Sequence, residues 1–132
     1  MPTTDRQTVA ATIIIDTPPD ALWAMVSDVT RMGEWSPETE WVEWLDGAIG
    51  PAVGARFKGN NRRGRAKWST TCHVTAAERG SYFAFTVGHP ARPATRWDYR
   101  FEPAGEGSTK VTESFELVKP LGFFSRLVTR LT

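Results

Sequence analysis

The sequence has little cysteine, little net charge and no long apolar run. Its single cysteine, Cys72, excludes an internal disulfide, so we expect a hydrophobic core in a reducing compartment. The formal net charge of +1 provides no global attraction to nucleic acid or to an anionic membrane. No apolar run approaches the roughly 20 residues of a membrane span. We therefore expect a single cytoplasmic domain over residues 1–132 without a signal peptide, nucleic-acid partner or stable membrane insertion, as a monomer or homodimer.

Recognisable catalytic and metal-binding motifs are also missing. The sequence contains no His-Glu-x-x-His and no paired cysteines, and neither His73 nor His89 stands at a spacing typical of a nucleophile motif. The glycine-containing segment 59–64 lacks the Lys-Ser/Thr ending of a phosphate loop and lies between strands. We expect no metal, no cofactor and no covalent intermediate.

Aromatic residues, in contrast, are abundant: the chain has 6 Trp, 7 Phe and 2 Tyr. In the segment 95–102 the rings of Trp97, Tyr99 and Phe101 alternate with charged residues. This period of two is typical of a strand with one wet face and one aromatic face. Such a face has to be covered, and few helices are available to cover it.

The order of elements predicts an antiparallel meander with helical cover. Thr17 fits a helix N-cap, Pro18 fits the first helical position, and a second short helical turn covers residues 30–35. An isolated first strand, with Val9 and Ile13 on one face, has to join a sheet edge. Six strands are expected at 39–45, 55–61, 67–77, 81–87, 95–102 and 110–118, and an amphipathic helix follows with Leu121, Phe124, Leu127, Val128 and Leu131. Its apolar stripe runs to the last residues, which allows the helix to continue in a longer chain.

This order, with five sequence segments, resembles the START-related SRPBCC superfamily, especially its polyketide cyclase/dehydrase-like branch. The resemblance implies an α+β helix-grip (START-like) fold: a seven-stranded curved antiparallel sheet, two short N-terminal helices and a C-terminal helix over a hydrophobic cavity. It also implies binding of a lipid, polyketide or similar apolar molecule, occasionally with cyclisation or dehydration. The last helix is shorter than is usual in relatives. The segments are Ile15–Pro19 with Leu22–Trp23 and Ser27–Asp28, Glu34–Glu38, Gly54–Phe57, Trp97–Pro103 and Val111–Phe115.

Strand parity predicts which side chains face the helices. These side chains either fill a solid core or line a cavity, and the resemblance favours a cavity. The Trp35-Ser36-Pro37 turn either closes the mouth of that cavity or plugs the gap between helix and sheet. Trp41 and Trp44 have opposite parity, so the sequence does not decide which of them points inward. The expected ligand-binding residues are Trp35, Phe57, Asn61, Trp68, Thr70, Cys72, Phe83, Phe85, Trp97, Tyr99, Phe101, Glu113 and Phe115.

Glu113 is the candidate for chemistry, since its parity places a carboxylate on the apolar face beside Val111 and Phe115. A buried carboxylate needs a partner or takes up a proton. In a functional interpretation Glu113 is an acid with a raised pKa or a hydrogen-bond anchor for a ligand, and Tyr99 is a second catalytic candidate. In a structural interpretation Glu113 pairs with an arginine at the sheet rim.

Three functions remain open at this point. The first is binding of a small hydrophobic ligand without catalysis. The second is a polyketide cyclase, aromatase or dehydratase in which Glu113 and Tyr99 move protons. The third is an interaction or toxin-like regulatory module that uses the terminal helix or the basic cluster of Arg62, Arg63, Arg65 and Lys67, although such a cluster is more often a solvated hairpin tip.

Overall fold

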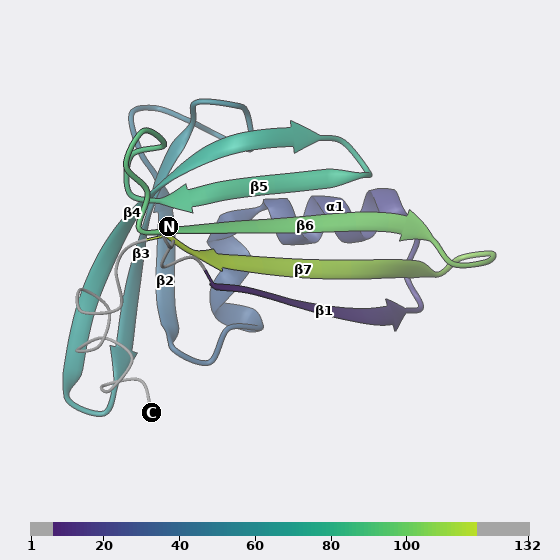
Figure 1. Ribbon diagram of the computed structural model, residues 1–132, viewed down its shortest axis with the longest axis horizontal. Coiled ribbons are helices and arrows are strands. Elements are labelled where there is room, and N and C mark those ends of the chain that lie inside the picture. Colours follow the sequence, from purple (N-terminus) through teal and green to yellow (C-terminus); the bar gives the residue numbers. More distant parts are fainter. Residues whose placement is uncertain (1–6, 119–132) are drawn as a thin grey trace, which may run out of the picture.

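The computed structural model describes residues 7–118, which form a seven-stranded antiparallel sheet with two helical segments on one face (Figure 1). The order across the sheet is β1-β7-β6-β5-β4-β3-β2, which is a meander of six strands with the first strand added at its end. Strands and turns therefore agree with the sequence prediction. The strands are β1 Gln7–Ile15, β2 Thr39–Trp44, β3 Arg56–Arg63, β4 Ala66–Glu78, β5 Tyr82–Val87, β6 Thr95–Pro103 and β7 Thr109–Leu117.

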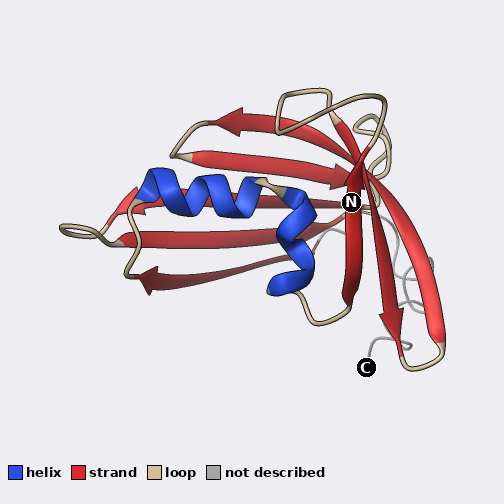
Figure 2. Cartoon of the chain, turned by 180° about the vertical axis from the view of Figure 1, so that it is seen from behind, coloured by secondary structure: helices blue, strands red, loops and turns tan. Residues whose placement is uncertain are grey.

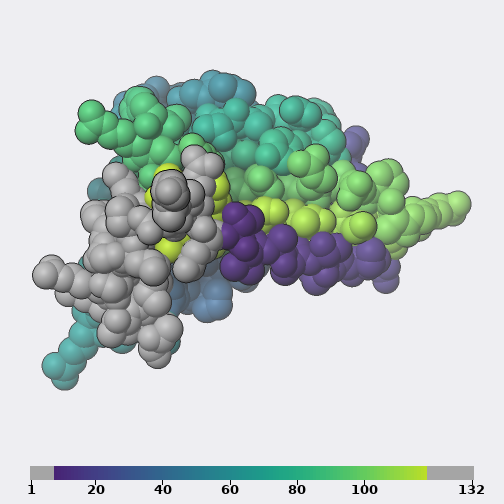
Figure 3. Space-filling model, viewed as in Figure 1, coloured from purple at the N-terminus to yellow at the C-terminus, as the bar shows by residue number. Residues whose placement is uncertain are grey.

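The first strand is an edge of the sheet, as predicted. It pairs with β7 along its whole length, from Gln7 opposite Leu117 to Ile15 opposite Thr109. Figure 3 shows β1 lying along β7 at the surface. Val9 and Ile13 keep more than half of their side-chain area exposed. This edge consequently brings apolar side chains next to the helices without burying them completely.

Two helical segments cover one face of the sheet (Figure 2). Helix α1 spans Pro19–Ser27, and the 3-10 helix η1 spans Val29–Glu34. The predicted cap is wrong by one residue: Pro18 is the N-cap and Pro19 the first helical residue. The carbonyl of Thr17 instead accepts a hydrogen bond from Thr109 Oγ1 at 2.6 Å, which fixes the strand–helix connection to β7.

A β-bulge decides the orientation of the tryptophans in β2. Thr39 pairs with Asn61, but Trp41 pairs with the adjacent Asn60, so the strand carries one extra residue between them. Trp44 therefore points inward and packs edge-on against Phe57, with 5.7 Å between ring centroids. Trp41 points outward and stays 52% exposed.

The core lies between the sheet and α1. Leu22, Val29, Phe57 and Phe83 are almost completely inaccessible. Trp23 is also buried, and its indole Nε1 donates a hydrogen bond to the carbonyl of Tyr82 at 2.8 Å. The bond satisfies a polar group that would otherwise be buried unpaired, and it fixes α1 on β5.

The amphipathic helix predicted after Pro120 lies outside the described residues. The cavity wall that the resemblance implies for it is therefore not part of the site described below. The described residues provide the sheet and the two short N-terminal helices of the predicted fold.

Candidate functional site

A hollow of about 430 Å³ lies between the sheet and η1. Its walls come from β3, β4, β5, β6 and β7, and η1 with the following turn closes one side. Aromatic and aliphatic side chains dominate the lining, and polar groups gather at one end. The lining residues are Met32, Trp35, Ser36, Pro37, Thr39, Phe57, Gly59, Asn61, Thr70, Cys72, Phe85, Val87, Trp97, Tyr99 and Glu113.

A second hollow of about 300 Å³ lies between α1 and the strands β1 and β7. Apart from the shared residues it is lined by hydrocarbon and thioether side chains. Trp35, Tyr99 and Glu113 line both hollows, and we call these three residues the seam. The further lining residues are Ala11, Ile13, Ile15, Leu22, Met25, Val26 and Val111.

Tyr99 and Glu113 form the polar part of the seam. They are opposite each other in the β6–β7 register, so the alternation of both strands turns both side chains to the helix side. Tyr99 is 6% exposed. Burial, the negative charge of Glu113 and a hydrogen bond to that carboxylate together raise the pKa of the Tyr99 hydroxyl well above its usual range. Tyr99 is thus a neutral hydrogen-bond donor at physiological pH.

Trp35 forms the apolar part of the seam. Its ring meets that of Tyr99 edge-on, with 6.4 Å between centroids, and 39% of the residue remains exposed. The preceding 3-10 helix is held by the Asp28 carboxylate, which accepts hydrogen bonds from the backbone and hydroxyl of Thr30. The indole of Trp35 is therefore partly exposed and lines both hollows.

Small polar groups mark one end of the first hollow. Thr39 Oγ1 lies 3.0 Å from Ser36 Oγ and 3.4 Å from Asn61 Oδ1. The Cys72 thiol lies farther along the wall beside Thr70 Oγ1, at 3.9 Å. Burial raises the pKa of Cys72 to about 12, so the side chain is a neutral thiol and a poor nucleophile.

The remaining predicted ligand-binding residues lie elsewhere. Phe83 and Phe101 are 0% and 3% exposed and belong to the core, not to the described lining of either hollow. Phe115 stacks at a tilt on Trp97, with 4.5 Å between ring centroids, and supports that wall from outside the described lining. Trp68 lines a third hollow of about 350 Å³ with Trp41, and this hollow shares Asn61 with the first.

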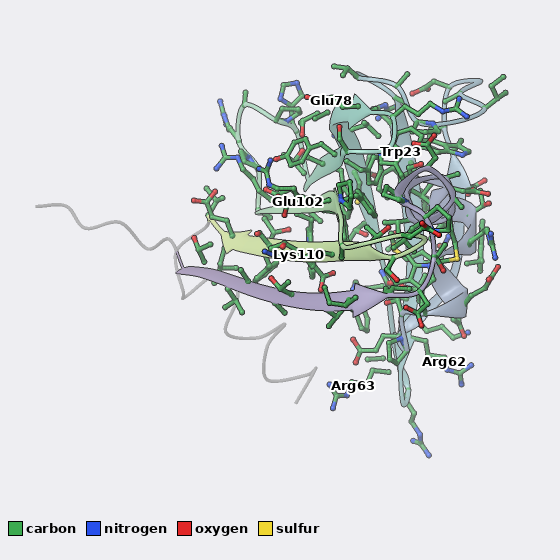
Figure 4. The ribbon with its side chains drawn as sticks, turned by 90° about the vertical axis from the view of Figure 1, so that its right-hand side faces the viewer. Trp23, Arg62, Arg63, Glu78, Glu102 and Lys110 are labelled. Carbon is green, nitrogen blue, oxygen red and sulfur yellow. The ribbon has the colours of Figure 1, made fainter. Side chains whose placement is uncertain are left out.

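Two arginines of the basic cluster, which lies at the hairpin between β3 and β4, have acidic partners. Arg62 pairs at 3.6 Å with Glu40 of the neighbouring strand β2, and Arg63 pairs at 3.2 Å with Glu38, which directly precedes β2. Figure 4 shows the two arginines at the end of the hairpin, away from the sheet body. These pairs balance much of the charge that the regulatory interpretation relies on, and they support a solvated hairpin tip.

His73 and His89 lie together away from the hollows. Their rings are 5.5 Å apart. Burial lowers the pKa of His73, and the neighbouring His89 and Arg56 lower it further. Within residues 7–118 no group of three or more His, Cys, Asp or Glu side chains is arranged to hold a metal ion. No helix in that range is long and apolar enough to cross a membrane.

The sequence analysis missed the second hollow. The signal is present in the sequence, because Ile13 and Ile15 stand two residues apart on one strand face and Leu22 and Val26 stand four residues apart on one helix face. The sequence did not give the distance between these two apolar faces. Sequence patterns show which face is apolar, but not whether two such faces are in full contact.

A family profile described as "Polyketide cyclase / dehydrase and lipid transport" matches residues 6–131. The chain belongs to this family. This confirms the resemblance to the SRPBCC superfamily, and membership implies binding of a hydrophobic ligand. No curated protein is similar enough to count as a match.

Solved structures share the fold. The solution NMR structure of a polyketide-cyclase-like protein from Corynebacterium glutamicum is 35% identical, covers 98% of this chain and 77% of its own, and has a TM-score of 0.64. A major latex-like protein from Panax ginseng is 14% identical over 96% of this chain and 93% of its own, with a TM-score of 0.69. A protein from Deinococcus radiodurans is 21% identical over 95% of this chain and 92% of its own, with a TM-score of 0.66.

Proposed function

We propose that this protein binds a small apolar molecule, such as a lipid or a polyketide-like aromatic compound, in the two hollows joined at the seam. The observation that carries the proposal is the pair of spaces of about 430 and 300 Å³ between the sheet and the helical segments, which share Trp35, Tyr99 and Glu113 as lining residues. Volumes of this order accommodate small organic ligands, and a mainly apolar lining with few polar groups is typical of such sites.

The polar groups of the hollow would orient the ligand. Asn61, Thr70 and Ser36 offer hydrogen bonds at one end of the first hollow, and Tyr99 and Glu113 offer them at the seam. An apolar ligand with one or two oxygen or nitrogen atoms matches this distribution better than a pure hydrocarbon. Polar groups that a ligand shields from water need hydrogen-bond partners on that ligand.

Blocking the hollow tests the proposal. Gly59 is a lining residue without a side chain, and an added Cβ would only touch Thr70 Oγ1 at 3.4 Å. Gly59→Leu should fill the first hollow and abolish stabilisation by a panel of fatty acids and aromatic polyketides, measured as the shift in melting temperature. The control Thr71→Leu adds the same side chain at an exposed position of the adjacent strand β4 and should preserve the shift.

Two results would count against binding in this hollow. The first is that no compound of the panel stabilises the unmodified protein. The second is that Gly59→Leu and Thr71→Leu respond equally to every ligand. Melting temperatures without ligand show whether each variant is folded.

A second proposal is an acid–base enzyme of the cyclase or dehydratase type, favoured by the Tyr99–Glu113 pair inside the hollow. The Glu113 carboxylate would take a proton from the carbon next to a carbonyl, and the neutral Tyr99 hydroxyl would donate a hydrogen bond to the enolate oxygen. Turnover of a polyketide-like substrate should then fall on the order of a hundredfold or more in Glu113→Gln. Unchanged turnover in this variant would remove Glu113 from the mechanism.

A further inference from the structure

Charge is distributed unequally between the two faces of the sheet at β6 and β7. On the outer face Arg96 pairs with Glu116 at 2.9 Å, and the guanidinium of Arg100 lies 4.9 Å from the centre of the Tyr82 ring. On the inner face the directly paired position is Tyr99 opposite Glu113. The arginines of β6 are therefore on the wrong face to neutralise Glu113.

None of the other described elements provides a cation to the hollows. Among the described residues, neither lining contains a lysine, arginine or histidine. The other titratable groups there are the Tyr99 hydroxyl and the Cys72 thiol, which are both neutral at physiological pH. Glu113 is thus the single carboxyl group that the described residues place in the lining of the two hollows.

The surroundings of this carboxylate are aromatic. Tyr99 and Trp35 flank it at the seam, and the first hollow continues along Trp97 and Phe85, whose rings are stacked with 6.4 Å between centroids. The faces of aromatic rings carry negative electrostatic potential and attract organic cations. A carboxylate among aromatic rings, with no lysine, arginine or histidine beside it in the described linings, is chemically complementary to an alkylammonium group.

We propose that the seam selects a protonated amine. The ammonium group of the ligand lies at Glu113, against the rings of Trp35 and Tyr99, and its apolar body occupies the hollow. This inference rests on the proposed function and names the ligand class for the same site. It also explains how a charged carboxylate is tolerated on an apolar face: the ligand supplies the missing counter-charge.

Three probes of equal shape and different charge test the inference: 4-phenylbutylamine, 4-phenylbutanol and 4-phenylbutyrate, each titrated calorimetrically at neutral pH. The amine should bind about tenfold or more tightly than the alcohol, and the acid should bind most weakly. Glu113→Gln should remove the preference for the amine and leave binding of the alcohol unchanged within about threefold. Glu113→Asp, which keeps the charge, should keep the preference.

Glu102→Gln is the matched control, because it removes one negative charge from the exposed outer face of β6 and should not change the preference. Equal binding of amine and alcohol, or an amine preference that survives Glu113→Gln, overturns the inference and leaves the proposed function intact. Tightest binding of the acid also overturns the inference. If none of the three probes binds, both proposals fail for this ligand size.

Discussion

Tyr99 and Glu113 face each other across β6 and β7, and their side chains line both hollows. The pair puts a buried phenol directly beside a carboxylate. Ionisation of the phenol would place two negative charges side by side in an apolar space. The structure therefore holds Tyr99 in its neutral form, and this has a consequence for stability at high pH.

Stability should decrease as the pH rises above about 10. The unfolded chain ionises its tyrosines near the ordinary pKa of 10.0, whereas burial and Glu113 raise the pKa of Tyr99 in the native state. Above this pH the unfolded state has lost a proton that the native state still holds, so the free energy of unfolding falls with rising pH. Urea denaturation at pH 8 and 11 measures the loss. Tyr99→Phe should make it smaller, and an unchanged loss in this variant would contradict the assignment.

Cys72 should react slowly with thiol reagents in the native state. Burial raises its pKa from 9.0 to about 12, which lowers the thiolate fraction at neutral pH by on the order of a thousandfold. Labelling with a chromogenic disulfide reagent should be fast in denaturant and very slow without it. Because Cys72 lines the first hollow, a bound ligand should slow the native reaction further. A native rate equal to that of the denatured chain would show that the thiol is exposed.

His73 should titrate below its ordinary pKa of 6.5. Burial is the largest cause, and His89 and Arg56 lower the pKa further. As the pH falls through 6.5, the unfolded chain takes up this proton before the native protein does, so the native state loses stability on acidification. NMR titration of His73 measures the pKa, which should rise in His89→Asn without reaching the ordinary value. No change in that variant would exclude the contribution of His89.

Trp23→Phe should cost about 1–3 kcal/mol of unfolding free energy, because it leaves the Tyr82 carbonyl without its indole donor. Chemical denaturation measures the difference. Trp41→Phe is the control: this indole is 52% exposed, and its replacement should change stability by about 0.5 kcal/mol or less. Equal effects of the two substitutions would show that the hydrogen bond does not fix α1.

Alternation along a strand is local, and for this reason the sequence predicted much of the site. Tyr99, Phe85 and Glu113 lie on the helix side as their parity requires, and Tyr99 and Glu113 are brought together by the register of adjacent strands in a meander. A carboxylate on an otherwise apolar face was visible in the sequence, because a period of two assigns every residue to a face.

Features that depend on one added or shifted residue, such as a β-bulge or the first residue of a helix, could not be predicted from the alternation in the sequence. The bulge near Thr39 turned Trp44 inward, and the start of α1 moved from Pro18 to Pro19. In both places the two alternatives, Trp41 or Trp44 pointing inward and Pro18 or Pro19 starting the helix, are nearly equivalent in local propensity. The choice between them follows from packing against distant partners, Phe57 in one case and Thr109 in the other.

The sequence by itself determined the strand order, the aromatic inner face and the family, since period, turn residues and motif order are properties of the chain. The tertiary structure decided where that face remains unfilled: Phe83 and Phe101 close the core, while Trp35, Tyr99 and Glu113 border open space. It also decided that the described linings bring no lysine, arginine or histidine to Glu113. Volume and charge balance are sums over residues from many elements, so only the assembled fold fixes them.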